Sequence, residues 1–274
     1  MKNKLCIAAE RVTGEDEFER HLAIAQQRNL GIEVQEFYLP TLMWGNWQAR
    51  LDQYQKLLQD FQGNLSIHNA FLGIDHVGLD ADVLALTQKK YDFIFMIAKE
   101  LGCKYIVSHF TWHPFATDVW LYEWQKAEVK FWDHYVNIAE KEGFVIVGEN
   151  TAEPRPEFIK PIIDTLNSDK FKFNLDTGHV NLHSQVPLED WLTIFGQDLV
   201  YMHVNNNYKN YDSHNSVLKG TVNFDHLFKI LDKLDITPTI TTEIYGDGLL
   251  ESLDYLEQKI RTSRAYQQNS GDRL

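Results

Sequence analysis

The amino-acid sequence predicts one α/β domain over residues 1–274, folded as a single (β/α)8 TIM barrel. Short runs of β-branched and aromatic residues alternate with longer stretches of helical periodicity, the pattern of parallel strands joined by crossover helices. The alternation occurs eight times and fills the chain, and barrels of about 250 residues fold as one unit. The segment after the first strand has a single glycine, Gly14, which disfavours an open sheet with a glycine-rich phosphate loop.

Each predicted strand is a short apolar run, and each is followed by a stretch in which apolar residues recur every three or four positions. The predicted strands, in order, are Lys4–Ala9, Gly31–Tyr38, Asn64–Asn69, Tyr105–Phe110, Phe144–Glu149, Lys172–Asp176, Val200–Asn205 and Thr239–Ile244. The predicted helices, in the same order, are Asp16–Arg28, Trp47–Phe61, Ala81–Leu101, Tyr122–Glu142, Pro156–Asn167, Pro187–Phe195, Phe224–Leu234 and Leu249–Tyr266. No linker marks a domain boundary, and the polar stretch 267–274 is expected to be a flexible tail.

Composition excludes several classes of protein. With 44% hydrophobic and 24% charged residues, the chain resembles ordinary globular proteins rather than disordered or fibrous ones. Its 26 basic and 39 acidic residues give a net charge of −13, which disfavours non-specific binding to nucleic acid or anionic membranes. Cys6 and Cys103 lie in apolar runs and are expected in the core of a protein from a reducing compartment. Without a signal peptide or a long apolar span, the chain is expected to be cytoplasmic.

Polar residues gather where the predicted strands end. Active sites of TIM barrels form at the carboxyl ends of the strands, where a charged side chain is less costly than in the barrel interior. Carboxylates and imidazoles that converge there would repel or stay unpaired without a cation, and this mixture of N and O donors suits a divalent metal ion such as Zn, Mn or Co. The nine residues are His68, His109, Glu149, Asp176, His179, His203, Asp212, His214 and Glu243.

Other polar and aromatic residues have less specific interpretations. The histidines in predicted helices are expected on the surface: His21, His134 and His226. Three histidines in predicted loops are expected to be ordinary polar loop residues, and the alternative is that they contact the substrate: His76, His113 and His183. Aromatic residues at strand ends could shape a pocket or pack the loops: Trp44, Phe71, Trp112 and Tyr245. Four apolar residues in predicted helices are expected to face the sheet, and the alternative is that they form the contact surface of a homo-oligomer: Phe93, Phe95, Trp124 and Phe131.

The ordered motifs on successive strands resemble the xylose isomerase-like barrels, which include sugar isomerases and epimerases and the endonuclease IV enzymes that cut abasic DNA. The resemblance spans nearly the whole chain. It rests on Ser66-Ile67-His68, Val107-Ser108-His109, Gly148-Glu149-Asn150-Thr151, Leu175-Asp176-Thr177-Gly178-His179, Met202-His203-Val204-Asn205-Asn206, Asp212-Ser213-His214 and Thr242-Glu243.

The resemblance to the sugar enzymes implies one divalent cation, Zn, Mn, Co or Mg, held by four of these residues: Glu149, Asp176, His203 and Glu243. It also implies that Glu149 and Glu243 act as catalytic proton carriers on the two faces of a substrate carbon, with an enediolate stabilised by the cation. The resemblance and the strand-end positions together give the expected substrate-binding residues His68, His109, His179, His214, Trp112 and Phe71.

The resemblance to endonuclease IV implies instead that all nine residues hold three zinc ions, with His68, His109, His179, Asp212 and His214 as the additional ligands. The sequence departs from that branch because the loops at 9–15 and 38–44 are acidic or apolar, and because Glu153 adds an acid after Glu149. Nucleic acid is therefore not an expected partner. The sequence departs from the sugar branch at 205–207, where three asparagines leave the substrate contact open.

The leading hypothesis is a divalent-metal-dependent isomerase or epimerase of a small sugar or polyol. The alternatives are an endonuclease IV-like zinc phosphodiesterase and a metal-dependent dehydratase or lyase of a hydroxylated carbonyl compound. A non-catalytic metal-binding protein is the remaining alternative.

Overall fold

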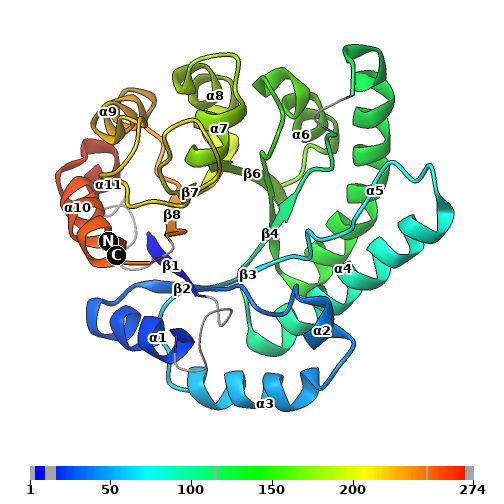
Figure 1. The fold of residues 1–274 in the computed structure, drawn as a ribbon, viewed down its shortest axis with the longest axis horizontal. Coiled ribbons are helices and arrows are strands. Elements are labelled where there is room, and N and C mark those ends of the chain that lie inside the picture. Colours follow the sequence, from blue (N-terminus) through cyan, green and yellow to red (C-terminus); the bar gives the residue numbers. More distant parts are fainter. Residues whose placement is uncertain (1–3, 10–16, 114–115, 245, 269–274) are drawn as a thin grey trace.

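Eight parallel strands close into a barrel in the computed structural model, which describes residues 4–9, 17–113, 116–244 and 246–268. Figure 1 shows the strands at the centre and the helices around them, with β1 beside β8 where the barrel closes. The strands are β1 (Leu5–Ala9), β2 (Gly31–Val34), β3 (Leu65–His68), β4 (Tyr105–His109), β5 (Val145–Glu149), β6 (Phe171–Asp176), β7 (Leu199–Val204) and β8 (Thr239–Thr242). The predicted fold class is confirmed.

Helices connect consecutive strands on the outside of the barrel. The helices are α1 (Glu17–Arg28), α2 (Pro40–Met43), α3 (Trp47–Leu58), α4 (Ala81–Leu101), α5 (Leu121–Glu142), α6 (Lys160–Leu166), α7 (Thr177–His183), α8 (Leu188–Phe195), α9 (Phe224–Leu234), α10 (Leu249–Thr262) and α11 (Arg264–Gln268). Three short 3₁₀ turns are η1 (Asp118–Trp120), η2 (Pro156–Phe158) and η3 (Gly196–Asp198). The first two residues of the predicted flexible tail, Gln267 and Gln268, belong to α11, and residues 269–274 lie outside the described residues.

Several element boundaries differ from the prediction. The strand predicted over Gly31–Tyr38 ends at Val34, and the chain then turns into the short helix α2, which Pro40 begins. The predicted helix Pro156–Asn167 is divided into η2 and α6, because Pro161 has no amide hydrogen to donate to the preceding turn and therefore lies in the first turn of a new helix. The predicted helix Leu249–Tyr266 is interrupted at Ser263, whose backbone is extended.

The longest helices begin and end with clear local signals. Asp80 precedes α4, and its carboxylate accepts hydrogen bonds from the amides of Asp82 and Val83, which satisfies two donors at the helix start. Gly102 and Gly143 follow α4 and α5 with positive φ angles of 70° and 87°, a conformation that costs glycine little. These caps fix where each chain reversal returns to the next strand.

The main core contains the apolar helix faces and one side of the strands, and a second buried cluster contains Val107, Val147 and Tyr201. Phe95, Trp124 and Phe131 are buried and Phe93 packs against that core, so these residues face the barrel as expected. Cys103 is likewise buried with a free thiol, as is Cys6. Among the described residues no helix combines the length and apolar character needed to cross a membrane.

Two histidines do not lie where the sequence suggested. His21 was expected on the surface, but it is 7% exposed because α1 packs that face toward the barrel; burial lowers its pKa. His76 is predicted to be an ordinary polar loop residue, but its side chain is buried. Its Nδ1 lies 2.8 Å from Oε2 of Glu128, and its Nε2 lies 2.9 Å from the hydroxyl oxygen of Tyr91. His134 and His226 are exposed as predicted.

Candidate metal centre and active site

A cavity of about 270 Å³ opens at the carboxyl ends of the strands and brings most of the predicted site residues together. Its lining contains four imidazoles, three carboxylates, one amide and one aromatic ring. The lining residues are Gln35, His68, Phe71, His109, Glu149, His179, Asp212, His214 and Glu243. Strand ends that are far apart in the sequence therefore form one polar wall, as the barrel fold requires.

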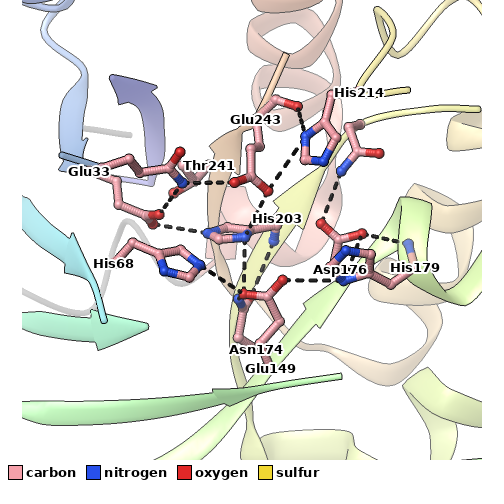
Figure 2. Close-up of polar contacts among 12 residues, drawn as sticks. Glu33, His68, Glu149, Asn174, Asp176, His179, His203, His214, Thr241 and Glu243 are labelled. Atoms are coloured by element: carbon pink, nitrogen blue, oxygen red, sulfur yellow. Dashed lines mark hydrogen bonds and ion pairs between the residues drawn. The ribbon is translucent and has the colours of Figure 1, made fainter. Parts of the chain in front are cut away.

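Four buried residues form the tightest group of donor atoms. Glu149 ends β5, Asp176 ends β6, His203 lies on β7, and Glu243 follows β8. One donor atom from each lies within 4.8 Å of the others. Nδ1 of His203 is 3.2 Å from Oε2 of Glu149 and 3.2 Å from Oε2 of Glu243, and Figure 2 shows the imidazole between these two carboxylates.

The chemistry of these donors fits a divalent cation. Nδ1 of His203 is buried and has no hydrogen-bond partner among the described residues, although buried nitrogen atoms almost always have one. Three carboxylates surround this nitrogen, and a divalent ion would satisfy it and offset their repulsion. The donor set of one imidazole and three carboxylates is compatible with Zn, Mn, Co or Mg.

The orientation of His203 is set by a residue that the sequence analysis did not identify. Its Nε2 lies 3.0 Å from Oε2 of Glu33, a buried carboxylate on β2 that also accepts a 2.8 Å hydrogen bond from the Tyr201 hydroxyl. Because Glu33 accepts the proton of Nε2, Nδ1 is the nitrogen that faces the other carboxylates and would bind a cation in place of its proton. This carboxylate–histidine arrangement is typical around metal ligands in proteins.

Two asparagines orient the other carboxylates. Nδ2 of Asn174 donates to Oε2 of Glu149 at 2.9 Å, and Nδ2 of Asn205 donates to Oδ2 of Asp176 at 2.9 Å. The second oxygen of Asp176 accepts a 2.7 Å hydrogen bond from the amide of His179, in the first turn of α7. The carboxylates are thus held by neutral donors, which leave their negative charge in place.

Two further groups of donor atoms lie in the cavity wall. His68 and His109 approach Oε2 of Glu149 at 3.9 and 3.8 Å. Asp212 Oδ2 lies 2.9 Å from Nε2 of His214 and 3.3 Å from Nε2 of His179. His68, His109 and Glu149 form one group, and His179, Asp212 and His214 form the other. In each group the three donor atoms lie within 4.8 Å of one another.

The clustered charges shift the acidity of the site. Burial lowers the pKa of His203, but the carboxylates of Glu149, Glu33 and Glu243 outweigh it and raise that pKa well above its ordinary value. Burial dominates at His109 and lowers its pKa to about 3. Burial raises the pKa of Asp176 to about 6. The carboxylates around His203 thus favour a positive charge at this position.

The three consecutive asparagines shape the loop after β7. Asn206 donates to the carbonyls of Val217 and Val222, and Asn207 donates to the carbonyl of Gly178. These side chains are buried and bonded to backbone, so the structure assigns them to loop packing, while Asn205 contacts Asp176. This loop carries Asp212 and His214 into the cavity.

The aromatic residues divide between the cavity and the loops. Phe71 lines the cavity, with its ring centroid 5.3 Å from those of His68 and His109. Trp112 was expected to bind substrate, but its ring packs against Trp124 and Phe158 at 5.2 and 4.9 Å and is not part of the cavity lining. Trp44 is exposed beside Lys89. Tyr245 lies outside the described residues.

Sequence reasoning missed Glu33 and Gln35, which both lie near the predicted cation ligands His203 and Glu243. Nε2 of Gln35 donates at 2.8 Å to Glu33 and at 2.8 Å to Glu243. The sequence does contain a signal for both residues. Residues 31–35 are apolar or glycine except for Glu33 and Gln35, which are two positions apart. Alternate residues of a strand point to the same side, so this spacing indicates two side chains directed into the barrel.

Comparisons with known proteins agree with this architecture. The TTHB071 protein from Thermus thermophilus, from a crystal soaked with ZnCl₂, is 24% identical with a TM-score of 0.78, covering 94% of this chain and 98% of its own. A D-tagatose 3-epimerase-like protein is 16% identical with a TM-score of 0.80, covering 98% and 100%. The IOLI protein with a bound zinc atom is 16% identical with a TM-score of 0.70, covering 98% and 97%. At these identities the likeness shows the fold.

A search of curated proteins finds no match to the sequence. The family described as xylose isomerase-like TIM barrel, by contrast, matches residues 24–266, which include every residue of the cavity wall. With the closed barrel and the donor groups that could hold a metal ion at its carboxyl end, this match shows that the chain belongs to the xylose isomerase-like TIM barrel family.

Proposed function

We propose that this protein is a divalent-metal-dependent isomerase or epimerase of a small sugar or polyol. The observation that carries the proposal is the position of Glu149 and Glu243, whose Oε2 atoms both lie 3.2 Å from the same nitrogen of His203. Two carboxylates thus flank one predicted cation position. The similarity to solved structures titled as sugar epimerases supports this class of reaction.

The residues have separate roles in this reaction. One carboxylate, Glu149 or Glu243, removes a proton from the carbon beside a carbonyl, and the other returns a proton to the opposite face. The cation, which Glu149, Asp176, His203 and Glu243 would hold, stabilises negative charge on the substrate oxygens when it is bound. The enediolate that forms when the proton leaves can be reprotonated on either side.

The cavity wall is expected to hold the sugar. His68, His109, His179 and His214 line it and offer ring nitrogens to hydroxyl groups, while Phe71 offers an apolar ring face. A volume of about 270 Å³ is compatible with a small substrate. We therefore expect a monosaccharide or a similar polyol rather than a polymer.

Exchange of substrate hydrogen with solvent tests the proposal. A panel of ketoses is incubated in deuterated water with the metal-loaded enzyme and with Glu149→Gln or Glu243→Gln. The wild type is expected to incorporate deuterium, and each variant is expected to lose this exchange. Glu157→Gln, which changes an exposed carboxylate, is the matched control. Undiminished exchange in either site variant would contradict the roles of the two glutamates, and an unsaturated product that absorbs in the ultraviolet would indicate a dehydratase.

The two additional donor groups favour a second candidate, a zinc phosphodiesterase of the endonuclease IV type. All nine predicted ligands belong to the donor groups around this cavity, which is the basis for three ions rather than one. The wall formed by the described residues contains no Lys or Arg to contact a phosphate. Elemental mass spectrometry of protein purified without added metal distinguishes the candidates: about one ion per chain supports the sugar enzyme, and about three, with cleavage of abasic DNA, support the phosphodiesterase.

A further inference from the structure

Gln35 is a buried amide in the cavity wall with no role in the reaction described above. It follows β2, where its backbone amide donates to the carbonyl of Ala9 at 3.1 Å. The residue is 2% exposed and contributes to the lining of the cavity. It therefore lies where a bound substrate would touch it.

Two carboxylates fix the orientation of this amide. Nε2 donates to Oε1 of Glu33 and to Oε1 of Glu243, at 2.8 Å in each case. Figure 2 shows the carboxylate of Glu33 on one side of His203 and that of Glu243 on another. Ionised carboxylates only accept hydrogen bonds, so the NH₂ group of Gln35 must face them, and both of its hydrogens are used.

The carbonyl oxygen Oε1 of Gln35 is left without a donor among the described residues, since both side-chain hydrogen bonds of this amide involve Nε2. Unlike Nδ1 of His203, this oxygen is not fully buried, so it borders the cavity that Gln35 lines and is accessible to a ligand. The oxygen is neutral and is a poor competitor for a cation beside three carboxylates, so a donor from the ligand is its natural partner. A hydroxyl group of a polyol supplies such a donor.

We propose that Gln35 is a specificity residue whose carbonyl oxygen accepts a hydrogen bond from one hydroxyl group of the substrate. The proposal rests on the proposed function, because it requires a polyol in the cavity. Fixing the amide between Glu33 and Glu243 means that the acceptor is already oriented before the substrate binds. An analogue that lacks this hydroxyl leaves the acceptor unpaired and is rejected.

The test combines substitutions of Gln35 with deoxy analogues of the best ketose. Gln35→Met removes both the acceptor and the donors with little change in size, whereas Gln35→Glu keeps an acceptor oxygen and removes the donors. Gln55→Met, at an exposed position on α3, is the matched control. Thermal unfolding and bound metal are measured for every variant, so that loss of folding or of the cation is recognised.

The expected result is a specific loss of discrimination. The wild type should prefer the ketose over one particular deoxy analogue by about 10- to 100-fold in kcat/KM. In Gln35→Met this preference should fall to about one, through a higher KM for the ketose and an unchanged KM for that analogue. Gln35→Glu should keep the preference but lower kcat on every substrate, because it adds a carboxylate that repels the two carboxylates of Glu33 and Glu243.

Other outcomes overturn one proposal or both. If Gln35→Met lowers kcat/KM equally on all analogues, or changes nothing, Gln35 does not select a hydroxyl group. Calorimetric binding of the ketose and of its deoxy analogues to the metal-loaded wild type and Gln35→Met separates this from a failure of the proposed function. The wild type could bind a ketose without turning it over and still prefer it over one deoxy analogue. If Gln35→Met removes that preference, the result supports the role of Gln35 and refutes the proposed epimerase activity. Absence of any ketose binding overturns both.

Discussion

Replacing Glu153 by Gln is expected to stabilise the protein above neutral pH and to have little effect near pH 5. Glu153 is 2% exposed, its Oε2 accepts a 2.7 Å hydrogen bond from the amide of Thr151, and its Oε1 is buried without a partner among the described residues. Burial raises the pKa of this carboxyl from 4.5 to about 8, although the Thr151 hydrogen bond opposes the change. The folded protein therefore keeps a proton that the unfolded chain loses.

The direction and size of the effect follow from this difference. Because the pKa is higher in the folded state, the contribution of Glu153 to stability is present below about pH 4.5 and is lost as the pH rises to about 8. At about 1.4 kcal/mol per pH unit, the loss approaches roughly 4 to 5 kcal/mol. Glutamine resembles the protonated acid and does not titrate, so Glu153→Gln should not show this loss.

Urea unfolding of the wild type and of Glu153→Gln at pH 5, 7 and 8.5 measures the effect. The variant should be within about 1 kcal/mol of the wild type at pH 5 and several kcal/mol more stable at pH 8.5. Glu157→Gln, at an exposed neighbouring position, should give a small difference that does not grow with pH. A constant difference between Glu153→Gln and the wild type across this range would refute the argument, because it would show that Glu153 releases its proton equally in both states.

Three further predictions concern the cation position and the loops. In Gly178→Ala the added Cβ would clash with Oδ1 of Asn205, so Asn205 must move away from Asp176. Titration of this variant against a competing chelator should show metal binding that is about 10- to 100-fold weaker than in the wild type. Glu128→Gln should lower the free energy of unfolding in urea by about 3 kcal/mol or more, because the buried carboxylate accepts four hydrogen bonds; a loss below about 1 kcal/mol would contradict this. Adding a divalent ion at about 100 times its Kd should stabilise the wild type by about 2.7 kcal/mol, seen as a higher Tm, and His203→Gln should show little of this increase.

The barrel was predictable because strand periodicity and helix periodicity alternate throughout the chain. Elements with strong patterns, such as Ala81–Leu101 and Phe224–Leu234, have the predicted bounds. The short helices α2 and α7 were not predicted, because four and seven residues are too few to show helical periodicity. For α7 the start depends on Asp176, which the sequence analysis considered only as a metal ligand.

The polar cavity wall was predictable from the rule that strand ends of a barrel meet at one face. Residues whose role depends on a partner elsewhere in the fold were not. His76 is a loop residue by sequence, and only the packing of α5 brings Glu128 against it. Glu33 likewise needs His203, 170 positions further on, before its place becomes clear. Roles of this kind depend on the tertiary fold and leave little local trace.

The residues predicted to hold a cation and much of the remaining cavity wall come from different halves of the chain. The four predicted ligands follow or lie on β5 to β8, whereas Gln35, His68, Phe71 and His109 follow or end β2 to β4. Mutations in the first half therefore alter the shape and hydrogen-bonding pattern offered to a substrate while the residues predicted to hold the ion stay the same. A barrel divided in this way can acquire a new substrate through changes in one half, which makes substrate preference an easier property to evolve than the chemistry itself.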